Sequence, residues 1–100
     1  MATENQDTVA SSWFVYVLYC ADGTLYTGIT TDTRRRVQEH NAGAPQGARY
    51  TRSRRPVTLA YVESAASRSA AARREWAIKK LDHPRKLALC APFASSSAKE

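Results

Sequence analysis

The chain has 100 residues, which is enough for one domain with a single compact core and too little for two. With 43% hydrophobic and 24% charged residues it has the composition of a globular protein, and no apolar run approaches the ~20 residues that span a membrane. Fifteen Lys and Arg against nine Asp and Glu give a net charge of +6, which favours a polyanionic partner such as nucleic acid.

The two ends of the chain are rich in Ser, Ala and Thr and have no periodicity. Residues 1–12 and 94–100 are therefore predicted to be disordered tails around a folded domain at 13–93. The first tail lacks the basic start and the apolar stretch of a signal peptide. Cys20 and Cys90 lie in separate apolar runs, which favours two buried thiols over a disulfide. We therefore expect a reduced, cytoplasmic protein that is monomeric and does not contact membranes.

The folded part begins with a predicted β-hairpin. Residues 13–20 (WFVYVLYC) form an unbroken aromatic and β-branched run, typical of a strand buried on both faces. Residues 21–24 supply turn chemistry, since Gly23 can take a positive φ, and residues 25–29 form the return strand.

A helix and an arginine-rich loop follow the hairpin. Asp32 can cap the helix, which stops at Gly43. Residues 44–55 form a loop dense in Arg, and residues 57–63 (VTLAYVE) alternate as a third strand.

Two helices end the domain. Ser67 can cap a long Ala-rich helix to about Leu81, and Pro84 can open a short last helix to about Cys90. The order β-β-α-β-α-α predicts an α+β fold, in which a small, mainly antiparallel three-stranded sheet is flanked by helices.

Two tyrosines of the hairpin are candidate site residues. Tyr16 lies in the middle of the first strand and Tyr26 near the start of the second, so the turn brings their phenols toward one region. Gly28 is unusual, because glycine inside a strand often marks the close approach of a ligand or another backbone. The alternative is two ordinary strand tyrosines with packed rings.

Arg36 and His40 share one face of the predicted helix because they are four residues apart. With Asn41 they form a cluster of hydrogen-bonding groups on a helix that follows the hairpin directly. The alternative is a solvated basic helix surface, which is the better interpretation for the neighbouring Arg34 and Arg35.

Glu75 lies on the long helix between small and apolar residues that are expected to face the sheet. A buried carboxylate is costly unless it is paired or binds a metal. The alternative is an intrahelical ion pair with Lys79, four residues further on.

Together these residues resemble the GIY-YIG nuclease family. Phe14-Val15-Tyr16 stands at the place of the first tripeptide and Tyr26-Thr27-Gly28 at that of the second. A helix with Arg36 and then His40-Asn41 follows, and Glu75 matches the acidic metal ligand of a later helix. The resemblance covers most of residues 13–90 and is closest to the short stand-alone bacterial members. The chain is more distantly similar to structure-selective repair endonucleases and to the excinuclease C subunit.

The sequence departs from the family pattern at few positions. Phe14 replaces the first Gly, Thr27 replaces an Ile, and the downstream Asn that some members carry has no match. Both tyrosines and Gly28 are kept.

The resemblance implies a metal-dependent endonuclease with five catalytic residues. Tyr16 would act as general base on a water, Tyr26 and His40 would orient that water and relay its proton, and Arg36 would grip the scissile phosphate. Glu75 would hold a single Mg²⁺ or Mn²⁺, mainly through water. Thr27, Gly28 and Asn41 are implied as supporting residues.

The expected substrate is DNA, contacted through its phosphate backbone and selected by structure, in DNA repair or processing. Arginines bind phosphate without reading base sequence, and Tyr50 and Trp76 can stack on an exposed base. For Trp76, a place in the core is an equal alternative. The expected nucleic-acid-binding set is Arg34, Arg35, Arg49, Tyr50, Arg52, Arg54 and Arg55. The main alternative is a basic nucleic-acid-binding module that does not cut, and a weaker one is a structural or protein-interaction domain.

Overall fold

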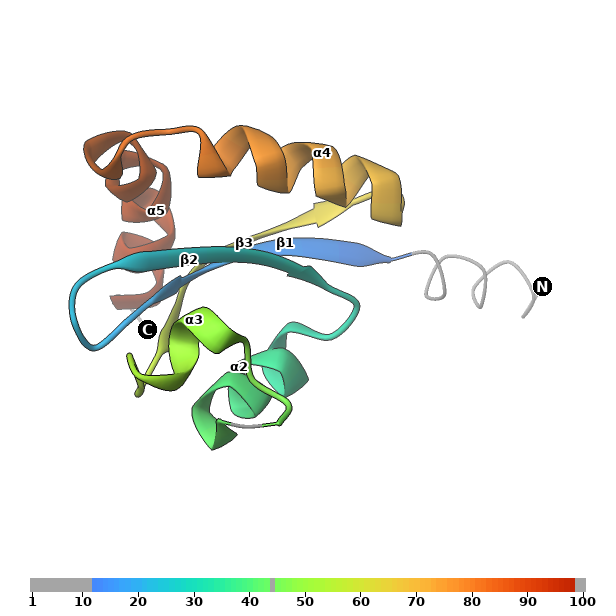
Figure 1. Cartoon of the computed structure of the whole chain (residues 1–100). Helices are drawn as coiled ribbons and strands as arrows, with labels where there is room; N and C mark the ends of the chain where they lie inside the picture. Colours follow the sequence, from blue (N-terminus) through green and yellow to red (C-terminus); the bar gives the residue numbers. More distant parts are fainter. Residues whose placement is uncertain (1–11, 44, 99–100) are drawn as a thin grey trace.

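The computed structural model describes residues 12–43 and 45–98, with side chains as far as residue 93, as a three-stranded sheet between two layers of helices (Figure 1). The order confirms the predicted α+β fold and adds one short helix, α3, inside the arginine-rich loop. The elements are β1 (Trp13–Tyr19), β2 (Leu25–Thr30), α2 (Thr33–Ala42), α3 (Arg49–Arg52), β3 (Thr58–Ala65), α4 (Arg68–Lys79) and α5 (His83–Ala98).

The central strand is β1, which pairs antiparallel with β2 on one side and with β3 on the other. Helices α4 and α5 cover one face of the sheet, and α2 and α3 lie against the other (Figure 1). Val15 and Val17 pack on the α4 and α5 side, whereas Tyr16 and Leu18 belong to the core on the α2 side. Because side chains alternate along a strand, burial on both faces requires the unbroken apolar run that β1 has.

Three local signals of the sequence have the structural roles predicted for them. Gly23 turns the hairpin with φ of 86°. The Asp32 carboxylate accepts a hydrogen bond from the Arg35 backbone N–H at 3.0 Å and so caps α2. The Ser67 hydroxyl accepts one from the Ala70 N–H at 3.1 Å and caps α4.

The last helix is longer than the sequence indicated. Helix α5 begins at His83 and continues through Pro92 to Ala98, so it includes residues 94–98, which we expected in a tail. Ala and Ser give no periodic signal there, but Ala has the highest helix propensity and readily prolongs a helix that has already begun. The tail expected at residues 1–12 lies outside the described part of the chain, except for Ser12.

Both cysteines are free and buried, as predicted. Cys20 lies in the core on the α2 side of the sheet and Cys90 in the core on the α4 and α5 side. Over the described residues, none of the helices has the length and apolar character needed to cross a membrane.

Candidate active site

Tyr16 extends over the neighbouring edge strand by crossing Gly28. The two residues are cross-strand partners, so they share one face of the sheet. A Cβ atom added to Gly28 would lie 2.6 Å from Cζ of Tyr16, far inside van der Waals contact. Glycine is therefore required at position 28 to make room for the phenol, which ends above β2 on the side of α2.

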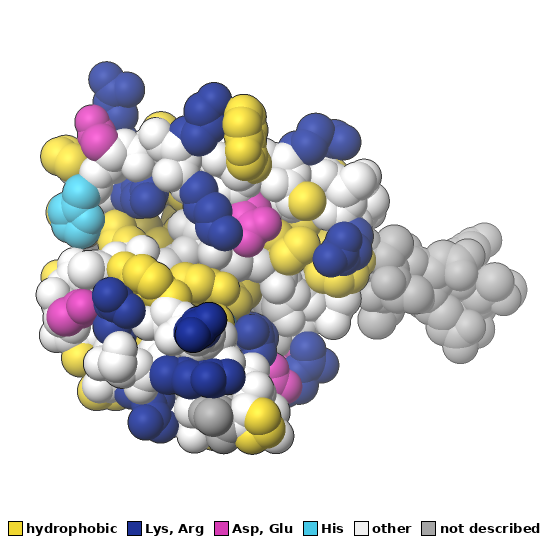
Figure 2. Space-filling model, in the orientation of Figure 1, with side chains coloured by type: hydrophobic (Ala, Val, Ile, Leu, Met, Phe, Trp, Pro, Cys, Tyr) yellow, Lys and Arg dark blue, Asp and Glu magenta, His cyan; other side chains and the backbone are white. Residues whose placement is uncertain are grey.

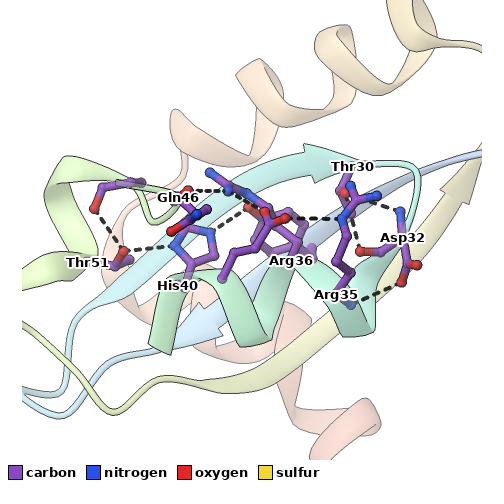
Figure 3. A network of polar contacts seen from close by, with 10 residues as sticks. Thr30, Asp32, Arg35, Arg36, His40, Gln46 and Thr51 are labelled. Carbon is purple, nitrogen blue, oxygen red and sulfur yellow. Dashed lines mark hydrogen bonds and ion pairs between the residues drawn. The ribbon is translucent and has the colours of Figure 1, made fainter. Parts of the chain in front are cut away.

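His40 connects the phenol of Tyr16 to α3 (Figure 3). Its Nε2 lies 2.9 Å from the Tyr16 hydroxyl oxygen, and its Nδ1 lies 2.8 Å from Oγ1 of Thr51. The His40 and Thr51 residues are completely buried. Sequence reasoning missed Thr51, because a threonine in a loop without periodicity gives no signal for a contact made eleven residues away.

Aromatic rings lead from this buried pair to the surface. The Tyr26 ring lies 5.2 Å from that of His40 and 6.4 Å from that of Tyr16, measured between centroids. On its outer side Tyr26 stacks with Tyr50 at 5.7 Å, and the Arg54 guanidinium covers the Tyr50 ring at 3.9 Å. The two predicted catalytic tyrosines are thus in one cluster, with Tyr50 at its exposed end.

Arg36 lies one helical turn before His40 and is held from two sides (Figure 3). Its Nη1 donates to the Glu39 carboxylate at 2.8 Å and to the Gln46 carbonyl oxygen at 2.7 Å. These bonds keep the half-buried guanidinium at the edge of the cluster, beside the Tyr16 phenol.

Burial sets the charge states of the central pair. It raises the pKa of Tyr16 to about 12, although the nearby Arg36 guanidinium opposes the rise. Burial, together with the positive charge of Arg36, lowers the pKa of His40 to about 4. At neutral pH the site therefore holds a neutral phenol against a neutral imidazole.

Glu75 approaches from the other helical layer. Its carboxylate is half-buried and lies 3.2 Å from Nζ of Lys79, which is the intrahelical pair considered from the sequence. Burial is the main cause of the raised pKa of Tyr16, and the negative charge of Glu75 adds a smaller upward contribution. Figure 2 shows Lys and Arg side chains over both helical layers on this face of the molecule, around a band of hydrophobic side chains.

A divalent cation fits this carboxylate only in a particular way. Among the described residues, no three His, Cys, Asp or Glu side chains are grouped closely enough to hold a metal ion. Magnesium commonly keeps most of its waters and binds through one or two carboxylates plus a substrate phosphate. Glu75 is a single carboxylate, so it could hold such an ion only in this open way.

Two of the expected supporting residues face away from the cluster. The Asn41 side chain exchanges hydrogen bonds with both backbone groups of Val57, at 3.0 and 2.7 Å, and so fastens the end of α2 to the start of β3. Thr27 is buried on β2, and strand alternation directs it to the α4 side of the sheet.

The arginines divide into exposed and anchored ones. Arg54 donates to Asp22 at 3.0 Å and to the Tyr50 carbonyl oxygen, and Arg55 donates to the carbonyl oxygens of Arg52 and Asn41. These two therefore shape the loop around α3. The arginines whose residues are exposed on α2 and α3 are Arg34, Arg35, Arg49 and Arg52.

Two tryptophans and one further arginine are also at least partly exposed. Trp76 is 64% exposed on α4 with the Lys80 ammonium 4.0 Å from its ring centre, so it is not a core residue. A hollow of about 350 Å³ beside Arg36 is lined also by Trp13 and Arg68, which sequence reasoning did not select. Both residues lie at the ends of elements, where no pattern indicates which side chains will meet.

The profile of the GIY-YIG catalytic domain matches residues 12–88, a span that contains the whole cluster. The chain belongs to the GIY-YIG family. This places it among nuclease domains and confirms the resemblance seen in the tripeptides.

The relatives of this GIY-YIG protein include small proteins named UPF0213. One from Desulfotalea psychrophila is 57% identical over 86% of this chain and 77% of its own length. Another from Halobacterium salinarum is 60% identical over 75% of this chain and 95% of its own.

Two solution structures have a similar fold. The protein EF2693 from E. faecalis is 41% identical, with a TM-score of 0.55 over 83% of this chain and 86% of that one. The UPF0213 protein BH0048 from Bacillus halodurans is 39% identical, with a TM-score of 0.51 over 80% and 83%.

Proposed function

We propose that this GIY-YIG protein is an endonuclease that hydrolyses phosphodiester bonds in DNA and uses one bound Mg²⁺ or Mn²⁺. The observation that carries the proposal is the Tyr16 hydroxyl, held against a neutral imidazole with Arg36 beside it and the charge of Glu75 acting on it from the other helical layer. A core tyrosine needs none of these neighbours.

The phenol acts as a base by passing its own proton on. A water beside the phosphate gives a proton to the Tyr16 oxygen while the Tyr16 hydroxyl gives its proton to Nε2 of His40. No free phenolate forms, so the barrier depends less on the high pKa of Tyr16 than on the lowered pKa of His40, which the negative charge of a bound phosphate would raise. The resulting hydroxide bonds to phosphorus as the bond from phosphorus to the leaving oxygen breaks. The leaving oxygen then takes a proton from solvent and His40 releases one.

In this proposal Arg36 and Glu75 offset the negative charge of the phosphate. The planar guanidinium of Arg36 can pair with two phosphate oxygens and offset the negative charge that gathers in the transition state. A divalent cation held by Glu75 would neutralise charge at the phosphate and the leaving oxygen when it is bound.

The exposed arginines support a nucleic acid as substrate. Arg49 and Arg52 project from α3 near the exposed Tyr50 ring, as backbone contacts beside a stacking surface would. Phosphate contacts carry no sequence information, so we expect selection by DNA structure, in repair or processing, by a cytoplasmic monomer.

A non-catalytic DNA-binding module is the second candidate. The observation in its favour is burial, since Tyr16 is 1% exposed and His40 is 0% exposed, as core residues are. In that case the cluster would stabilise the fold and only the arginines would touch nucleic acid.

A cleavage assay on duplex, nicked, branched, flapped and single-stranded DNA separates the two candidates. The endonuclease cuts with Mg²⁺ or Mn²⁺, stops with a chelator and loses at least ~10²-fold in rate on Tyr16→Phe, which keeps the ring and removes the hydroxyl. Tyr61→Phe is the matched control, because Tyr61 bonds to Glu63 on β3. Wild-type protein that binds these DNAs and cuts none of them supports the module.

A further inference from the structure

We propose that Thr51 is a positioning residue that holds His40 in the one neutral tautomer able to receive the proton of Tyr16. The tautomer follows from the hydrogen bonds alone. Its catalytic consequence rests on the proposed function.

The donor and the acceptor of each hydrogen bond can be assigned in turn, starting at the Ala48 carbonyl oxygen and ending at the Tyr16 hydroxyl. A backbone carbonyl only accepts, so the Thr51 hydroxyl, 3.1 Å from the Ala48 carbonyl oxygen, donates its single hydrogen there. The Thr51 oxygen is then left to accept, and its partner at 2.8 Å is Nδ1 of His40, which must carry a hydrogen. A neutral imidazole has one N–H, so Nε2 is bare and accepts from the Tyr16 hydroxyl.

The opposite tautomer leaves a donor without a partner. If Nε2 carried the hydrogen, the Tyr16 oxygen would have to accept it, and the hydroxyl hydrogen of Tyr16 would need another acceptor. In the described part of the chain, the polar groups against that hydroxyl are His40 and the Arg36 guanidinium, and a guanidinium only donates. A buried hydroxyl without an acceptor is unfavourable, and this favours the tautomer assigned above.

The place of Thr51 in the fold suits this task. It lies in the four-residue helix α3 and is completely buried, with its backbone N–H also directed to the Ala48 carbonyl oxygen at 3.2 Å. Its hydroxyl is therefore fixed by the same turn that places the exposed Arg49 and Arg52. The loop between α2 and β3 thus has a buried side, where Thr51 orients His40, and an exposed side, where Arg49 and Arg52 carry positive charge.

Nitrogen NMR of the histidine rings tests the assignment directly. The chain has two histidines, and His83, which is exposed on α5, serves as the internal reference. In wild-type protein at neutral pH, the His40 Nδ1 resonance is expected in the range of a protonated nitrogen and Nε2 in that of a bare one. His83 should give averaged values. A reversed pattern for His40 overturns the proposal, whatever the activity of the protein.

Variants test whether Thr51 is the cause. Thr51→Val keeps the shape and removes the hydroxyl, so the His40 pattern should become mixed or reversed and cleavage should fall roughly 10- to 100-fold, as for other partners that orient a histidine. Thr51→Ser should restore both, and Thr58→Val on the exposed start of β3 should change neither.

The outcomes separate this inference from the function on which it rests. If Thr51→Val does not fold, the wild-type spectrum and Thr51→Ser still decide the tautomer. A wild-type protein that shows the expected tautomer and never cuts DNA refutes the endonuclease and leaves the assignment standing. A Thr51→Val protein that is folded, with an unchanged His40 pattern and rate, refutes the role of Thr51.

Discussion

The Glu75 carboxylate can be explained in two ways, as an ion-pair partner of Lys79 or as a charge that acts at the candidate site. Lys79 pairs with it at 3.2 Å along α4, and its negative charge makes a contribution, minor beside that of burial, to the raised pKa of Tyr16. An exposed i, i+4 ion pair contributes only a few tenths of a kcal/mol, so the pair alone does not explain a half-buried carboxylate at this place.

The variant Glu75→Gln removes the charge and keeps the size of the side chain. Cleavage should fall by at least ~10²-fold, the scale expected when an electrostatic group of the transition state is lost. DNA affinity, measured without divalent metal, should hold or increase, because a negative charge facing phosphate has gone. Lys79→Gln is the control, and it should leave the rate within about twofold. Equal rates for Glu75→Gln and wild type would reduce Glu75 to a partner of Lys79.

His40 should make the protein sensitive to mild acid. The unfolded chain binds a proton on this residue near pH 6.5, whereas the folded chain does so only near pH 4, so stability falls as the pH drops below 6.5. At pH 5, which lies above the usual pKa values of the carboxyl groups, roughly 2 kcal/mol of unfolding free energy should be lost relative to pH 7.

Urea unfolding at pH 7 and pH 5 measures this loss. His40→Gln, which can still bond to Tyr16 and Thr51, should remove most of the difference between the two pH values. His83→Gln on the surface should keep it. The prediction fails if wild type and His40→Gln lose the same amount.

At the scale of elements, the hairpin of β1 and β2 carries the two tyrosines and the glycine between them. Tyr16 and Gly28 are one cross-strand pair, so the second tripeptide provides the space that the first one occupies. The two motifs are therefore parts of a single contact.

Two glycine variants distinguish a steric clash with a neighbouring side chain from strain of the glycine's own backbone. Gly28→Ala forces a methyl group against the Tyr16 ring and should cost about 1–3 kcal/mol of stability and most of the activity. Gly23→Ala meets nothing within 4 Å but sits at φ of 86°, so it should lose stability through the backbone and keep the activity per folded molecule. Unfolding curves and cleavage rates on both proteins check this. A fully active Gly28→Ala would show that the phenol can move without loss.

Local chemistry made the elements predictable. The caps at Asp32 and Ser67 and the unbroken run of β1 each depend on neighbours in sequence, and all three were expected. Four of the five expected catalytic residues also meet in one cluster, and the charge of Glu75 acts on it.

What sequence reasoning missed depends on distant partners. Helix α3 is four residues long and is held by a hydroxyl that bonds to His40 on another helix, so its own sequence gives no periodic signal. Asn41 was expected to support the chemistry because it follows His40. Its bonds to Val57, sixteen residues away, show a fastening between elements that adjacency in sequence does not reveal.

At the scale of the molecule, the chain has a net charge of +6, and Figure 2 shows Lys and Arg side chains over both helical layers on one face. Such a surface binds a polyanion through the release of condensed counterions, so affinity depends steeply on salt. Arg52 is exposed on the same short helix as Tyr50, and the Arg54 guanidinium covers the Tyr50 ring, so these two arginines are the natural pair to test.

Replacing Arg52 and Arg54 together by Ala should weaken binding to all DNA sequences alike. Each lost phosphate contact lowers the slope of log affinity against log salt by about 0.9, so loss of the exposed Arg52 should change it by about 0.9 and loss of Arg54, which pairs with Asp22, should add less than that. Titrations at several salt concentrations measure the slope, and Arg85→Ala on α5 is the control. A change in sequence preference with an unaltered slope would show that these side chains read bases.

The position of β2 at the edge of the sheet has a cost for storage and handling. An edge strand offers unpaired backbone groups that can add a strand from another copy and start aggregation, and proteins commonly cover such edges. DNA that contacts Tyr16 would pass this edge, and repulsion between cationic copies is one protection against such pairing. High salt removes that repulsion, since screening shortens to about 3 Å at 1 M. The conditions that release this protein from DNA are thus those in which its copies are least protected from one another.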